Sequence, residues 1–76
     1  MQEMVKDKLA KRFAEAHIEV SVDGSHVNVL VVSDEFEGLR PVKKQQLVYA
    51  ELAPLIADGT LHAVNMQTLT PSEHAQ

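Results

Sequence analysis

The sequence has no cysteine and no tryptophan, and only two phenylalanines, one tyrosine and three glycines. Without a thiolate, the chain has no disulfide framework and no self-contained iron–sulfur site. Three isolated glycines do not make a phosphate loop or a dinucleotide-binding fingerprint, and no metalloprotease helix or serine elbow is present. The few aromatic rings leave little surface for stacking on unpaired bases. We therefore predict that the protein is not an enzyme and does not read single strands.

The length and charge of the chain set further bounds. Seventy-six residues predict one domain, residues 1–76, because chains of this size bury only about 60% of their unfolded surface. The net charge is −4, and all seven basic residues lie before position 45. The longest aliphatic run, Val29–Val32, is too short to cross a membrane, and the first residues do not form a signal peptide. We expect a cytoplasmic protein without a membrane partner.

Hydrophobic periodicity predicts the first half of the fold. Apolar residues at helical spacing favour a helix over roughly residues 2–16, and alternation predicts a strand over residues 17–22. Asp23-Gly24 then indicates a hairpin turn, and the β-branched residues 27–32 form the expected central strand. A loop with a buried Phe36 follows.

The second half predicts a helix, a strand and a helical stub. The helix begins at Pro41 and stops at Asp58-Gly59, with a break or a kink near Ala53 because Pro54 removes a hydrogen bond. Residues 60–69 alternate like a strand, and residues 70–73 make a capping box shortly before the chain ends. This order predicts an α/β (α+β) fold with a three-stranded mixed sheet and helices on one face.

Four histidines are the unusual chemical feature of a chain without cysteine. His26 follows the hairpin turn and His62 lies near the start of the last strand, so the two could approach one another if that strand lies beside the hairpin. Neutral imidazole is a common metal ligand. The alternative is that His62 is a half-buried, hydrogen-bonded histidine and His26 a turn residue. His17 and His74 are weaker candidates.

The entry to the second helix is the other candidate site. A glycine-containing turn before a helix with nearby basic residues grips nucleic-acid phosphates in KH domains, where the turn reads Gly-x-x-Gly. The residues concerned are Gly38, Arg40, Lys43 and Lys44. Because this turn has Arg40 and no second glycine, the match is weak, and an ordinary helix-entry loop is the alternative.

Five ordered blocks resemble the BolA family, most closely its IbaG-like bacterial branch, over roughly residues 18–73. The blocks are Phe36-Glu37-Gly38, residues 42–49, Ile56-Ala57-Asp58-Gly59, Leu61-His62-Ala63-Val64 and Thr68-Leu69-Thr70-Pro71. The resemblance implies a class II KH-like fold, in the order α-β-β-α-(α)-β, which agrees with the order expected from periodicity.

The resemblance also implies a function. Members of the family pair with monothiol glutaredoxins and share a glutathione-ligated [2Fe–2S] cluster, in iron–sulfur trafficking, iron homeostasis and stress response. His62 matches the family's nearly universal ligand, and His26 stands where a second ligand comes from the loop between the first strands. The alternative that the family offers is a DNA-binding transcriptional regulator. Alone, such a chain is expected to be a monomer or a weak homo-oligomer.

The sequence departs from the family at its end. Many relatives carry an aromatic residue, usually Trp, three places after the Pro of Thr-Pro and continue through a full helix. Here that place is His74 and the sequence stops two residues later.

Overall fold

The computed structural model describes residues 2–24 and 26–75. The elements follow the predicted order of helix, hairpin, helix, strand and short helix. They are α1 (Gln2–Arg12), β1 (His17–Asp23), β2 (His26–Val32), the 3₁₀ helix η1 (Asp34–Phe36), α2 (Pro41–Ala57), β3 (Ala63–Leu69) and α3 (Pro71–His74). Among these, no helix is long and apolar enough to cross a membrane.

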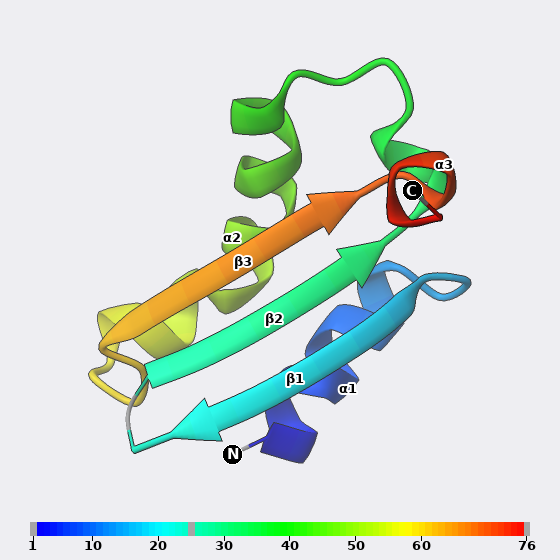
Figure 1. The fold of residues 1–76 in the computed structure, drawn as a ribbon. Helices are drawn as coiled ribbons and strands as arrows, with labels where there is room; N and C mark the ends of the chain where they lie inside the picture. The colour runs from blue at the N-terminus through cyan, green and yellow to red at the C-terminus, as the bar shows by residue number, and fades with distance from the viewer. Residues whose placement is uncertain (1, 25, 76) are drawn as a thin grey trace.

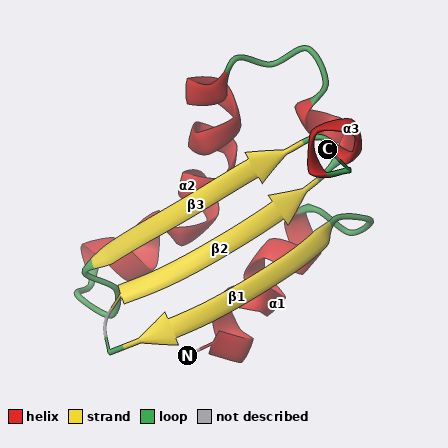
Figure 2. Ribbon diagram, in the orientation of Figure 1, coloured by secondary structure: helices red, strands yellow, loops and turns green. Residues whose placement is uncertain are grey.

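The three strands form one mixed sheet in the order β1-β2-β3, which confirms the predicted sheet (Figures 1 and 2). β1 pairs antiparallel with β2 from His17↔Val32 to Asp23↔His26. β2 pairs parallel with β3, and His26 is the register partner of Ala63. α1 and α2 cover one face of the sheet, as a helix-on-sheet layer predicts. The other face is open, apart from α3 beyond the carboxyl end of β3 (Figure 1).

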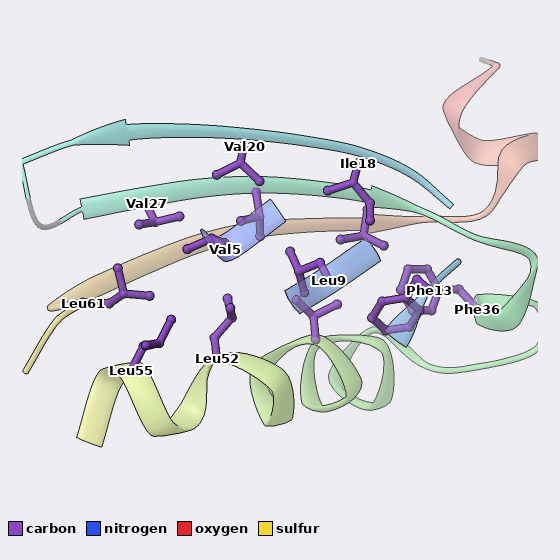
Figure 3. Close-up of a cluster of buried hydrophobic side chains, with 13 residues drawn as sticks. Val5, Leu9, Phe13, Ile18, Val20, Val27, Phe36, Leu52, Leu55 and Leu61 are labelled. Atoms are coloured by element: carbon purple, nitrogen blue, oxygen red, sulfur yellow. The ribbon is translucent and has the colours of Figure 1, made fainter. Parts of the chain in front are cut away.

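The hydrophobic core lies between the sheet and the two long helices (Figure 3). Val5 and Leu9 of α1 are fully buried, one turn apart, which explains why this stretch is helical. Val27 and Val31 supply the inward side of β2. The remaining members include Phe13, Phe36, Leu52, Leu55 and Leu61.

Two predicted boundaries are wrong. α1 ends at Arg12 rather than near residue 16, because the N–H of Ala16 donates to the carbonyl of Phe13 in a turn that leads the chain into β1. β3 begins at Ala63, three residues later than predicted. The N–H of Leu61 donates to the carbonyl of Leu55 at 3.1 Å, and this buried side chain joins the core. The chain bends at His62 before the strand starts.

Of the break or kink predicted near Ala53, the break is wrong, since α2 continues through Pro54 to Ala57. The ring removes the hydrogen bond that this residue would donate to Ala50. Ala50 and Pro54 are both exposed, so water can donate a hydrogen bond to the freed carbonyl of Ala50. The N–H of Asp58 donates to the carbonyl of Pro54 at 3.1 Å, which continues the helical pattern beyond the proline.

Candidate metal-ligand site

His26 is the first residue of β2 and is exposed to solvent. Because side chains alternate along a strand and Val27 is in the core, His26 lies on the open face of the sheet. Its antiparallel partner on β1 is the exposed Asp23. The sequence predicted the turn at Asp23-Gly24, but we did not foresee that the carboxylate-bearing Asp23 would be the strand partner of His26. The short separation between Asp23 and His26 across a hairpin turn was the available signal.

His62 lies in the bend immediately before β3 and is also exposed. The half-buried histidine that was the alternative is not found, because the bend takes this side chain out of the alternation of β3. Exposure leaves the imidazole accessible to a ligand from outside the chain.

The parallel pairing of β2 with β3 brings the two histidines to the same end of the sheet. His26 is paired with Ala63, the residue after His62, and neighbouring strands lie about 4.8 Å apart. The backbone of His62 therefore lies one position before the register partner of His26. Within residues 2–24 and 26–75, no group of three or more His, Asp and Glu side chains is arranged to hold a metal ion. This end of the sheet offers a pair of nitrogen donors.

The other two histidines lie at the opposite end of the sheet. The rings of His17 in β1 and His74 in α3 have centroids 5.6 Å apart and are tilted by 34°. His17 Nε2 also lies 2.6 Å from a carboxylate oxygen of Glu19. The sequence did not reveal this pair because its members are far apart along the chain and are brought together only by the fold. They are placed apart from His26 and His62 and serve as internal controls for them.

The basic residues of the helix entry lie in different environments. Gly38 has a φ of +77° and turns the chain, while Arg40 and Lys43 are exposed at the start of α2. Lys44 is buried, with 6% of its surface exposed. Its ammonium group donates to Glu73 and is thereby used within the chain. The structure thus leaves Arg40 and Lys43 as the outward-facing cations of this turn.

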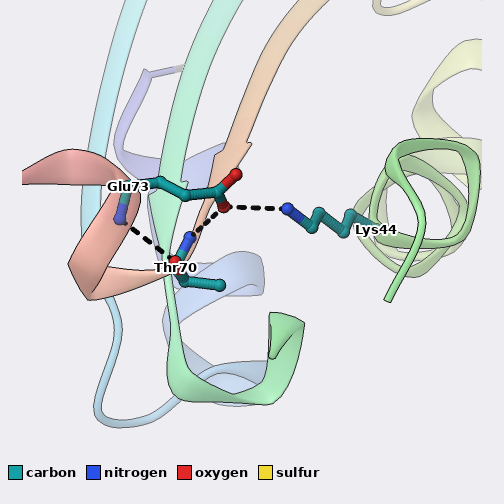
Figure 4. A network of polar contacts seen from close by, with 3 residues as sticks. All are labelled: Lys44, Thr70 and Glu73. Carbon is teal, nitrogen blue, oxygen red and sulfur yellow. Dashed lines mark hydrogen bonds and ion pairs between the residues drawn. The ribbon is translucent and has the colours of Figure 1, made fainter. Parts of the chain in front are cut away.

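Lys44 belongs to a polar network that fixes α3 (Figure 4). Oε1 of Glu73 accepts hydrogen bonds from Lys44 Nζ and from the backbone N–H of Thr70, both at 2.8 Å. The hydroxyl of Thr70 accepts from the N–H of Glu73 at 3.1 Å, which completes the predicted capping box. These hydrogen bonds hold the pKa of the Glu73 carboxyl below its ordinary value. The bond from Lys44 has the larger effect, and the bond from the Thr70 N–H the next largest.

The fold and these sites define a small α/β domain that presents side chains on an open surface. The family model described as BolA-like protein matches residues 5–73. The chain therefore belongs to the BolA-like family, which confirms the resemblance seen in its sequence blocks.

Relatives and solved structures agree with this assignment. The acid stress protein IbaG of Escherichia coli K12 is 48% identical over 59 residues, which cover 78% of this chain and 70% of the relative. BolA1 from Arabidopsis thaliana has a TM-score of 0.83 and 33% identity, covering 95% of this chain and 93% of that one. The BolA domain of SufE1 from the same plant has the same TM-score and coverage, with 32% identity.

Proposed function

We propose that this chain is a non-enzymatic adaptor that shares a glutathione-ligated [2Fe–2S] cluster with a monothiol glutaredoxin, using His26 and His62 as its ligands. The observation that carries the proposal is their position at one end of the sheet, in adjacent register and both exposed. Such an adaptor would serve iron–sulfur trafficking and iron homeostasis. The similarity to an acid stress protein extends the proposal to a role in stress response.

The two imidazoles fit a cluster site that is shared with a partner better than a site formed by this chain alone. Two imidazoles supply half of the four protein ligands that a [2Fe–2S] cluster usually takes, and histidine replaces cysteine on one iron in Rieske centres. Because the sequence has no cysteine, the sulfur ligands have to come from the partner and from glutathione. When bound, the cluster would supply iron and sulfide for transfer to another protein.

The residues of this chain would hold and release that cargo. Each imidazole has to be neutral at the nitrogen that binds iron. The exposure of both side chains lets a partner protein approach the site without opening the core. That a BolA domain also forms part of SufE1 is consistent with a domain that works together with another protein.

Spectroscopic reconstitution tests the proposal. The chain, a monothiol glutaredoxin and glutathione would be mixed with ferrous iron and sulfide under anaerobic conditions, and absorption and circular dichroism spectra recorded. We expect charge-transfer bands that differ from those of the glutaredoxin homodimer. His62→Ala should remove that difference, and His26→Ala should weaken or shift it.

The matched control is His74→Ala, which removes an exposed imidazole from the other end of the sheet. This variant should keep the spectrum of the mixed complex. A spectrum that is unchanged in His62→Ala, or lost equally in His74→Ala, would contradict the proposed ligands.

A further inference from the structure

The free edge of β3 lacks the features that usually keep an edge strand from pairing. β3 is the last strand of the sheet and pairs only with β2 among the described residues. Its seven residues, AVNMQTL, include no charged residue, proline or glycine. Soluble proteins commonly protect edge strands with charges, prolines or bulges. The opposite edge strand, β1, carries Glu19 and Asp23. The edge of β3 is therefore able to accept another strand.

A groove runs beside this edge, between β3 and α2. Its lining includes Val42, Gln46 and Tyr49 of α2 together with Val64, Asn65 and Met66 of β3, and no charged side chain lines it. Val42 and Tyr49 are 62% and 47% exposed, although they are large hydrophobic residues. The amino-terminal half of α2 extends beyond the edge of β3 (Figure 1) and forms one side of the groove.

We propose that this groove, the β3 groove, binds an extended and uncharged segment of a partner protein, which adds to the sheet as a fourth strand beside β3. Backbone groups of the segment would pair with the free edge, as in other cases of strand addition. Every second side chain would face Val42 and Tyr49, so the segment should carry an apolar residue at alternate positions. The remaining side chains would lie near the amide of Asn65.

The charge and shape of the β3 groove favour this occupant over two others. A nucleic acid would need cations for its phosphates, and none lines the groove. A second copy that paired through its own β3 would bring its α2 onto the helical face of the joined sheet. The amino-terminal half of α2 of the first copy already projects into that space (Figure 1). A single extended segment occupies only the strand position. The proposal does not depend on His26 or His62, because neither lines the groove.

Hydrogen exchange of the full chain with a probe peptide tests the proposal. The probe is a capped peptide of alternating threonine and valine, about as long as the seven residues of β3, with a lysine at each end. We expect it to slow amide exchange in β3, leaving β1 unchanged. A second peptide with N-methyl groups on the amides of one edge keeps the side chains but removes the backbone donors. It should bind at least about tenfold more weakly.

Variants of exposed residues distinguish peptide binding in the β3 groove from nonspecific hydrophobic binding elsewhere on the surface. Tyr49→Asp and Val42→Asp place a charge in the groove without removing a buried side chain, and each should weaken the probe peptide by about tenfold. Met4→Asp is the matched control, because Met4 is an exposed hydrophobic residue on α1. Circular dichroism would verify that all three variants are folded.

Four results would overturn the proposal. The first is no slowing of exchange in β3 at millimolar peptide, and the second is equal affinity for the N-methylated peptide. The third is slowing that depends on protein concentration alone, which would assign the edge to a second copy. The fourth is slowing by duplex DNA but not by the peptide, which would assign the groove to nucleic acid.

Discussion

The ammonium nitrogen of Lys44 lies 2.8 Å from Oε1 of Glu73, and this contact ties the buried side of α2 to the last helix of the chain. A helix of four residues is too short to form by itself, because the first turn of a helix is costly to nucleate. The ion pair and the capping box of Thr70 and Glu73 together supply the missing stabilisation. α3 is thus held by side chains rather than by a core.

This contact predicts a specific dependence of stability on pH. The pKa of Glu73 in the folded chain is below its ordinary value of 4.5, so the ionised carboxylate stabilises the fold. That contribution is fully present above the ordinary pKa and is lost as the pH falls through the lower, folded value. We expect Glu73→Gln to lower the urea midpoint at pH 7, and the two midpoints to converge as the pH falls below the ordinary value of 4.5.

Because Asp58 is a second carboxyl with a lowered pKa, wild type has to be compared with Glu73→Gln at each pH. The side-chain and backbone hydrogen bonds of Thr60 also lower the pKa of Asp58, so the wild-type chain loses stability in acid for more than one reason. The quantity to measure is the difference between wild type and Glu73→Gln at each pH. A difference that stays constant from pH 7 to about pH 3 would show that this carboxylate does not contribute through its charge.

The sequence predicted the parts of the fold that follow from local pattern. The core positions Val5 and Leu9, the Asp23-Gly24 turn and the capping box at Thr70 are all decided by neighbouring residues. The parallel pairing of β3 also followed, because a helix between two strands of one sheet is a crossover connection. The ends of α1 and β3 did not follow, since those are set by tertiary contacts.

Three further features were not predictable from local sequence pattern. Helical propensity argued for a break at Pro54, but the exposed carbonyl of Ala50 can bond to water instead. Lys44 looked like a surface cation until the fold placed Glu73 beside it. The exposure of His62 depends on the bend before β3, which the burial of Leu61 requires.

The contact between Phe13 and Phe36 should make their substitutions non-additive. The two rings have centroids 5.6 Å apart at 60°, the edge-to-face arrangement that aromatic pairs favour. We expect a double-mutant cycle of Phe13→Leu and Phe36→Leu to give a coupling of about 0.5–1.5 kcal/mol in the free energy of unfolding. The control is Leu55→Ala with Phe36→Leu, at opposite ends of the core (Figure 3), which should add within about 0.5 kcal/mol.

Gly24 should be required for its backbone and not for its size. Its φ is +62°, and a Cβ built there meets no atom within 4 Å. Gly24→Ala should destabilise the chain by about 1 kcal/mol, because this conformation disfavours L-residues with a side chain. Gly24→Asn should cost less, since asparagine tolerates the left-handed region. Chemical unfolding would measure both, with exposed Ser21→Ala as a control that should change little. Equal losses for Ala and Asn would contradict this account.

Acid should release the cluster from the mixed complex before it releases the cluster from the glutaredoxin homodimer. Protons compete with iron for the imidazole nitrogens of His26 and His62, whereas the homodimer has no histidine ligand in this proposal. The two complexes would be titrated in parallel from about pH 8 to pH 5, following their visible circular dichroism bands. The mixed complex formed with His74→Ala should lose its bands over the same range as wild type. If the mixed complex and the homodimer lost their bands together, the loss would be assigned to ligands that both complexes share, and nitrogen ligation by this chain would be rejected.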